Sequence, residues 1–394
     1  MTVPERRGRA RKPKRLLVVA HTHPRITQGG AEIVAYEQFR RARDEERIEA
    51  WFLASNGAAH DAKPGVVISQ PFGAGEYLHR GGTFEPFTLS NPDPAFEREF
   101  GALLRTLRPD TVHFHHYAGI GIEALLYVRQ HAPSARIVVT LHEYMLICHH
   151  FGQMVTRPGY DLCHAASPQG CHRCFPEHAP QEFVLRELWL KRFLREVDEF
   201  TSPSAFLRER YVAWGIPAEK IRVSPNLLPP HAAVARQARA AGEAMRVAFF
   251  GQLTPLKGVE VLIRAARRLA GSGHAITFRL YGSYAAQPSA FQERIRAALA
   301  DLPDNMTYKG GYRNEDVLAL MAENDVIVVP SLWWENSPVV LAEAARAGCR
   351  VVGSDLGGIR ERLAGMPGSS TFGVGDADAL AQRLIQIALE TKSR

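Results

Sequence analysis

The sequence of 394 residues lacks the long apolar runs that mark membrane proteins. No stretch approaches the roughly 20 consecutive apolar residues of a membrane-spanning helix, and no hydrophobic signal-peptide segment follows Met1. With 46% hydrophobic and 23% charged residues, the composition is that of a globular protein. We therefore expect a soluble protein that stays in the cytoplasm.

Excess basic charge is also absent outside one short segment. Residues 1–15 carry seven Lys and Arg side chains against Glu5, which accounts for six of the net +7 charges. We predict that residues 1–14 form a disordered, solvated tail, which is also suited to peripheral contact with anionic lipid on the cytoplasmic membrane face. Because the remaining chain supplies neither a stacking platform nor a recognition helix, nucleic acid is not an expected partner.

The chain is too long for a single hydrophobic core, and its pattern of elements divides it in two. We predict an N-terminal domain at 15–225, a linker at 226–244 and a C-terminal domain at 245–394. Apolar segments alternate with helical segments in both domains, which implies an α/β fold of two facing Rossmann-like domains with parallel sheets and a cleft between them. The Gly- and Pro-rich stretch 60–94 is predicted to be irregular loop. Strands are predicted near 15–20, 49–54, 111–115, 136–141, 246–250, 275–281, 305–309, 325–330 and 350–353.

The most informative segment, 330–348, follows a buried apolar strand and opens a helix. Ser337 is suited to cap this helix and Pro338 to its first position. Glu335 then lies in the loop before the helix, and Glu343 lies more than one turn inside it. Free N–H groups at a helix start bind phosphate, and carboxylates there accept hydrogen bonds from hydroxyls. The segment therefore indicates a site for a sugar and a phosphate together.

A second loop, 251–258, joins an apolar strand to a helix at 259–270 and carries Lys257 at the helix start. A lysine in this position can pair with a diphosphate, helped by the helix dipole. The two loops resemble the Glu-x7-Glu and Gly-Arg-Leu-x3-Lys-Gly motifs of retaining family 4 glycosyltransferases. Gln252 stands where the second motif has arginine, which removes a bidentate cation.

This resemblance covers about residues 15–380 and implies a GT-B fold and transfer of a sugar from a nucleotide-sugar donor to a hydroxyl acceptor, with retention. It implies a hexosyltransferase-type enzyme whose acceptor is a glycan, a lipid-linked sugar or a small molecule. Lys257 would stabilise the leaving diphosphate, Glu335 would orient the donor sugar and Glu343 would meet the ribose. The remaining donor-binding residues implied by the two motifs are Gly251, Gln252, Asn336 and Ser337.

Three looser matches to the same family lie elsewhere in the chain. Gly29-Gly30 follows the first strand and would bring backbone near the donor phosphates or the acceptor. His142 ends a buried strand, where ligands bind in α/β sheets, and would face the transferred sugar. Gly357-Gly358 belongs to a stretch that resembles the family's Gly-Gly-x-x-Glu loop, which implies substrate binding; a simple turn is the alternative.

A metal-binding Asp-x-Asp at a strand end is lacking. The only such spacing, Asp376-Ala-Asp378, precedes a helix at 379–390, where N-capping explains it better. We therefore expect no catalytic divalent metal, with Lys257 and helix dipoles in its place.

Cysteine is scarce, but four of the five cysteines lie within 27 residues of a Cys- and His-rich insertion at 145–178. One pair has the x2 spacing of a zinc half-site, and disulfides are not expected in a reducing cytoplasm. We predict a structural zinc ion; an iron–sulfur cluster and four unliganded thiols are the alternatives. The insertion is adjacent to His142 and is expected to shape the acceptor pocket. The proposed ligands are Cys148, Cys163, Cys171 and Cys174.

Two other classes of protein stay open at this stage. A nucleotide-sugar epimerase would have the same two-domain architecture, and Gln252 together with the short C-terminus would suit a catalytically lapsed nucleotide-sugar-binding protein. An epimerase would leave an isomerised donor, whereas a transferase liberates nucleoside diphosphate. The residue types identify neither the donor base nor the sugar nor the acceptor.

Overall fold

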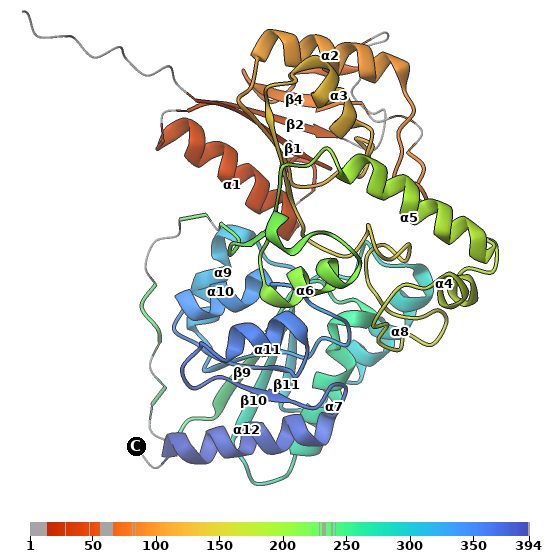
Figure 1. The fold of residues 1–394 in the computed structure, drawn as a ribbon. Helices are drawn as coiled ribbons and strands as arrows, with labels where there is room; N and C mark the ends of the chain where they lie inside the picture. The colour runs from red at the N-terminus through yellow and green to blue at the C-terminus, as the bar shows by residue number, and fades with distance from the viewer. Residues whose placement is uncertain are drawn as a thin grey trace, which may run out of the picture.

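The computed structural model describes residues 14–27, 29–46, 48–55, 66–80, 82, 84–227, 229–230, 234–237, 239–240 and 242–392. They form two α/β units, one above the other in Figure 1, each built on its own sheet. Of the predicted basic tail, only Lys14 lies within the described residues, so its contact with anionic lipid stays a prediction. Within the described part of the chain, no helix combines the length and apolar character needed to cross a membrane.

The N-terminal unit holds an eight-stranded sheet in the order β3-β4-β2-β1-β5-β6-β7-β8, parallel except for the β3–β4 pair. Its strands are β1 (Arg15–Ala20), β2 (Glu49–Ser55), β3 (Ile68–Ser69), β4 (Glu76–His79), β5 (Thr111–Phe114), β6 (Arg136–Thr140), β7 (Glu199–Ser202) and β8 (Ile221–Val223). Its helices are α1 (Gly30–Asp44), α2 (Pro94–Leu107), α3 (Ala124–His131), α4 (Pro168–Cys174), α5 (Pro180–Leu194) and α6 (Ala205–Ala213).

The C-terminal unit holds a six-stranded sheet in the order β11-β10-β9-β12-β13-β14, with every pair parallel. Its strands are β9 (Met245–Phe250), β10 (Ile276–Tyr281), β11 (Met306–Gly310), β12 (Val326–Val329), β13 (Arg350–Ser354) and β14 (Ser370–Phe372). Its helices are α7 (Val259–Leu269), α8 (Ser289–Ala300), α9 (Val317–Ala322), α10 (Val339–Arg346), α11 (Gly357–Leu363) and α12 (Ala377–Lys392).

Helices on both faces explain why the central strands are apolar throughout. In β1, Leu17 and Val19 pack with α2, α3 and α5, whereas Val18 and Ala20 pack with α1 on the opposite face. In β12, alternate residues likewise face α7, α8 and α12 or face α9, α10 and α11. Side chains of a strand alternate between the two faces, so a strand covered on both faces needs apolar residues at every position.

The structure corrects three local predictions. The stretch 60–94 was expected to be loop, but it contributes β3 and β4, and β4 pairs in parallel with β2. Gly357-Gly358 was expected to lie in a loop or a turn, but it begins helix α11. Pro338 rather than Ser337 occupies the N-cap position of α10, and no side chain caps that helix.

Candidate functional site

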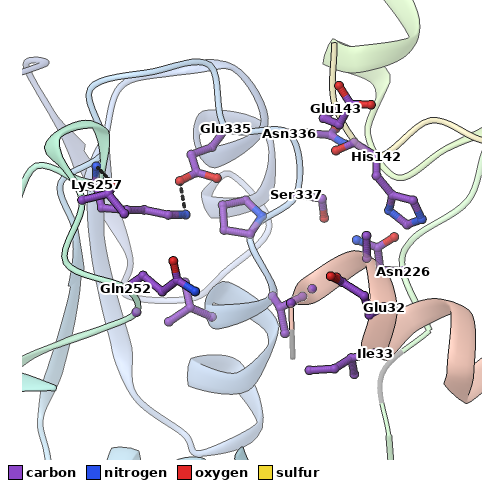
Figure 2. Close-up of a pocket in the computed structure, with 18 of the residues that line it drawn as sticks. Glu32, Ile33, His142, Glu143, Asn226, Gln252, Lys257, Glu335, Asn336 and Ser337 are labelled. Carbon is purple, nitrogen blue, oxygen red and sulfur yellow. Dashed lines mark hydrogen bonds and ion pairs between the residues drawn. The ribbon is translucent and has the colours of Figure 1, made fainter. Parts of the chain in front are cut away.

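The carboxyl ends of both sheets face one cavity of about 520 Å³, lined by residues of both units. Figure 2 shows Gln252, Lys257 and Glu335 on one side and Glu32, His142 and Glu143 on the other. Parallel strands direct the loops that follow them toward the same edge of a sheet, so the loops after β1, β6, β9 and β12 meet here. The predicted residues that line the cavity are Gly29, Gly30, His142, Gly251, Gln252, Lys257, Glu335, Asn336, Ser337 and Glu343.

Gly258 allows the two donor-side loops to lie against each other. Its φ of +69° is in the left-handed region, and a Cβ atom there would stand 1.8 Å from the carbonyl oxygen of Pro330. Just before it, Thr254 caps a short turn by accepting a hydrogen bond from the Lys257 backbone N–H at 3.3 Å. The Lys257 side chain is thereby held beside the loop that follows β12.

Lys257 and Glu335 form the central polar contact of the cavity. The Lys257 Nζ donates to Oε1 of Glu335 at 2.5 Å, and the same oxygen accepts from Ser331 Oγ at 2.8 Å and Trp333 Nε1 at 3.0 Å. Glu335 is only 5% exposed, so these three donors compensate its burial. All hydrogen bonds that the described residues donate to this carboxylate reach Oε1, which leaves Oε2 for a ligand.

Glu343 lies on α10 and is a buried carboxyl without an ion-pair partner among the described residues. Burial raises the pKa of Glu343 to about 7, with Arg346 opposing the shift. The nearby Tyr312 lines the same cavity, and the pKa of its hydroxyl is raised by burial and by the Glu343 charge. Glu343 can therefore change protonation near neutral pH when a ligand binds.

The N-terminal wall carries two His–carboxylate pairs that the sequence reading did not identify. His21 Nε2 lies 3.0 Å from Glu32 Oε1, and His116 Nε2 lies 3.4 Å from Glu143 Oε1. Burial raises the pKa of Glu32, but the hydrogen bond and charge of His21 outweigh it and hold that pKa below its usual value. Glu32 follows Gly29-Gly30 and Glu143 follows His142, so position beside a motif was the available signal.

The start of α1 comes close to the start of α10 across the cavity. A Cβ atom on Gly30 would lie 3.3 Å from Val339 Cγ2, and one on Gly29 would lie 2.5 Å from Glu32 Oε2. Gly30 therefore leaves room where the N-terminal unit approaches the donor-side helix, and Gly29 leaves room for the Glu32 carboxylate. Their role in substrate binding stays a prediction.

Asn336 joins the two units. Its Nδ2 donates to the carbonyl oxygen of His142 at 3.1 Å, and its Oδ1 accepts from Ser204 Oγ at 2.6 Å. Gly358 supports the same loop, because a Cβ atom there would stand 1.5 Å from the Asn336 carbonyl oxygen. Gly358 and Gly357 are not among the residues that line the cavity, and Gly357 packs against Phe206.

The four cysteines of the insertion are free thiols in the structure. Within the described ranges, no group of three or more His, Cys, Asp or Glu side chains is placed to hold a metal ion, so the zinc prediction finds no support. Burial raises the pKa of Cys148 to about 11, and the neighbouring Cys163 and Cys171 add to that shift. The insertion does reach the donor-side loop, since Trp334 Nε1 donates to the Cys163 carbonyl oxygen at 2.9 Å.

Curated relatives match part of the chain. It is 30% identical over 194 residues to the amylovoran biosynthesis glycosyltransferase AmsK of Erwinia amylovora, which covers 47% of this chain and 46% of that protein. It is 29% identical over 153 residues to a phosphatidyl-myo-inositol mannosyltransferase of Mycolicibacterium smegmatis, covering 39% of this chain and 38% of that protein. The chain thus spans less than half the length of these relatives.

Solved structures match nearly the whole fold. Sucrose-phosphate synthase of Thermosynechococcus elongatus aligns with a TM-score of 0.69 at 17% identity, over 96% of this chain and 91% of that one. Anabaena HepE in complex with UDP-glucose aligns with a TM-score of 0.61 at 16% identity, over 96% and 94%. The likeness at these identities establishes the fold, which is the GT-B arrangement of two Rossmann-like domains.

Family models match both units of the chain. The model described as Glycosyl transferases group 1 matches residues 244–390, and the model described as Glycosyltransferase Family 4 matches residues 28–231, more than half of the sequence. The chain therefore belongs to glycosyltransferase family 4.

Proposed function

We propose that this protein transfers a sugar from a nucleotide-sugar donor to a hydroxyl acceptor, with retention at the anomeric carbon. The observation that carries the proposal is the ion pair of Lys257 and Glu335 at 2.5 Å, in a cavity that also holds Glu343 and His142. One cation, two carboxyl groups and a helix start suit a ligand that combines a diphosphate with hydroxyl-rich sugars.

Donor binding exchanges one partner of Lys257 for another. In the ligand-free protein its ammonium group is paired with Glu335, which prevents an unpaired buried carboxylate. A diphosphate carries more charge than a single carboxylate and therefore competes for Lys257. The Glu335 carboxylate, still held by Ser331 and Trp333, then accepts hydrogen bonds from the donor sugar.

We assign deprotonation of the acceptor to the departing diphosphate. The bond from the anomeric carbon to the phosphate oxygen breaks, the bond to the acceptor oxygen forms on the same face, and the acceptor proton moves to the phosphate oxygen. Lys257 stabilises the charge that develops on the diphosphate. Glu32 and Glu143 also line the cavity, but each carboxylate is paired with a histidine.

The direct test is incubation with UDP-, GDP- and ADP-sugars and a panel of sugar and lipid-linked acceptors. We expect nucleoside diphosphate release that depends on acceptor, and a product whose anomeric configuration, read by NMR, equals that of the donor. HepE was solved with UDP-glucose, so UDP-glucose is the first donor to examine. An inverted product would contradict retention, and an isomerised donor without transfer would identify an epimerase instead.

Metal chelation is expected to leave donor binding unchanged, because Lys257 supplies the cation at the diphosphate. We attribute the Asp-x-Asp spacing to helix capping, because Asp376 Oδ1 accepts from the backbone N–H groups of Asp378 and Ala379 at 3.0 and 2.9 Å at the start of α12. Donor affinity measured by calorimetry with EDTA should equal affinity with added Mg²⁺ or Mn²⁺. If EDTA lowered donor affinity by more than about tenfold, equivalent to about 1.4 kcal/mol, a metal ion would be binding the diphosphate.

Replacing Gln252 with arginine is expected to tighten donor binding by roughly fivefold or more, because a charge-assisted hydrogen bond exceeds a neutral one by about 1 kcal/mol. Gln252 lines the cavity on the same side as Lys257 (Figure 2). The gain should shrink at high ionic strength. Gln382→Arg, on the exposed face of α12, is the matched control for added charge. Unchanged affinity in Gln252→Arg would place residue 252 away from the diphosphate.

A further inference from the structure

His142 stands at the end of a chain of hydrogen bonds that runs through the interior of the N-terminal unit. Its Nε2 lies 3.0 Å from Nδ1 of His115, whose Nε2 lies 2.7 Å from Oε1 of Gln38 on α1. The Gln38 Nε2 lies 2.8 Å from Nδ1 of His113. The chain ends with His113 Nε2 at 2.7 Å from Thr140 Oγ1 and Thr140 Oγ1 at 2.6 Å from Thr201 Oγ1.

The amide of Gln38 fixes the direction of this chain. In the structure the Gln38 amide oxygen faces His115 and its NH2 group faces His113. In this orientation the oxygen accepts, so His115 carries its proton on Nε2. The Nδ1 of a neutral His115 is then an acceptor, and the hydrogen bond to His142 requires the proton on His142 Nε2. On the other side, the Gln38 NH2 group donates to His113, which in turn donates from Nε2 to Thr140.

The three histidines of this hydrogen-bond chain, His113, His115 and His142, are neutral at physiological pH. Burial, assisted by the charges of His113 and His142, holds the pKa of His115 well below its ordinary value. Burial, with the charges of His116, His21 and His113, lowers the pKa of His142 to about 3. A neutral imidazole donates from one nitrogen and accepts at the other, so the tautomer decides what His142 offers to the cavity.

We propose that Gln38 is a positioning residue that sets the tautomer of His142, so that this histidine meets the bound substrate as a hydrogen-bond acceptor. With the proton on Nε2, the lone pair lies on Nδ1. Among the described residues no side chain or backbone group bonds to that Nδ1, and it is not among the buried atoms that lack a partner. It is therefore accessible from the cavity that His142 lines.

The chemical class of the group opposite His142 follows from this assignment. An accepting Nδ1 binds an O–H group, such as a sugar hydroxyl, and repels a carboxylate, a phosphate or a carbonyl oxygen, none of which can donate. That this hydroxyl belongs to the donor sugar rests on the proposed function. The tautomer itself does not, because it is a property of the ligand-free protein.

The test is two-dimensional NMR of the full chain with 15N-labelled histidine, which distinguishes protonated from unprotonated ring nitrogens. His142→Asn identifies the signals of His142. In the unsubstituted protein at pH 7 we expect the proton on Nε2 of His142 and a bare Nδ1. A proton on Nδ1 would overturn the proposal with no variant and no ligand needed.

Two substitutions of Gln38 are then expected to place the His142 proton on opposite ring nitrogens. Gln38→Lys offers only donors, so His115 must accept at Nε2 and donate from Nδ1, which moves the His142 proton to Nδ1. Gln38→Glu offers only acceptors and leaves the His142 proton on Nε2. Thr201→Val cuts the far end of the chain and is expected to leave the His142 signals unchanged. If folded Gln38→Lys keeps the parental His142 signals, Gln38 does not set this tautomer.

Discussion

Replacing Lys257 with methionine is expected to lower sugar transfer by about 10²- to 10³-fold, the loss that follows removal of one preorganised donor to developing negative charge. Methionine keeps most of the length of the side chain and removes only the ammonium group that lies 2.5 Å from Glu335 Oε1. The measurement is turnover at saturating donor and acceptor. In the variant, cleavage of the bond between the sugar and the diphosphate should limit turnover, because Lys257 no longer stabilises the charge that develops on the leaving group.

Folding should survive this change, because Ser331 and Trp333 continue to donate to Glu335 and Lys257 is 31% exposed at its side chain. Because the buried Glu335 carboxylate loses its charged partner, we expect the free energy of unfolding to fall by about 1–3 kcal/mol. Lys309→Met, an exposed lysine of the same unit outside the cavity, is the control for loss of a charge. If a well-folded Lys257→Met variant turned over at the parental rate, Lys257 would have no role in the reaction.

Glu343 is expected to make donor binding depend on pH. A ribose hydroxyl binds the ionised carboxylate best, and the pKa of Glu343 is about 7 in the free protein. Below that pH a proton must leave before the donor binds, so donor affinity should rise about tenfold between pH 6 and pH 8. Calorimetry at three pH values measures this. Glu343→Gln should flatten the dependence and weaken binding about tenfold at pH 8, where a charge-assisted bond is lost.

The Glu343 carboxyl should also make the stability of the ligand-free protein fall as pH rises, whereas donor affinity rises. Its folded pKa of about 7 lies above the ordinary 4.5, so the folded protein holds this proton more tightly than the unfolded chain. That contribution is fully present below pH 4.5 and is lost as pH rises through 7. Glu343→Gln should therefore stabilise the ligand-free protein at pH 8 by about 1–3 kcal/mol, measured by denaturant unfolding. Weaker donor binding without this gain would mean that residue 343 is not buried as a carboxyl.

Local sequence was sufficient for the donor-side loops, because each is a strand, a loop and a helix start that are contiguous in the chain. Lys257 and Glu335 were predicted to share one site from their positions after β9 and β12, and the structure joins their side chains. Their roles in catalysis stay predictions. Edge elements were missed where the signal was weak: β3 has two residues and β4 has four, and β4 is held by its pairing with β2.

Long-range contacts decided the rest. His21, His116 and Gln38 belong to no local motif. They come near His142 and its neighbours because β5 lies between β1 and β6, and because α1 packs against β1. The cysteine spacing predicted a metal site, but the path of the whole insertion decides whether the thiols converge on one point. Among the described residues no such metal-binding group forms.

The sequence by itself determined the two α/β halves, the central strands and the two loops that carry Lys257 and Glu335, because hydrophobic period and helix-start chemistry are local. The tertiary structure decided the protonation of Glu343, the pairing of Glu32 and Glu143 with histidines, and the hydrogen-bond chain behind His142. The burial of a side chain and the direction of its hydrogen bonds depend on the residues packed around it. Here those residues are distant in the sequence.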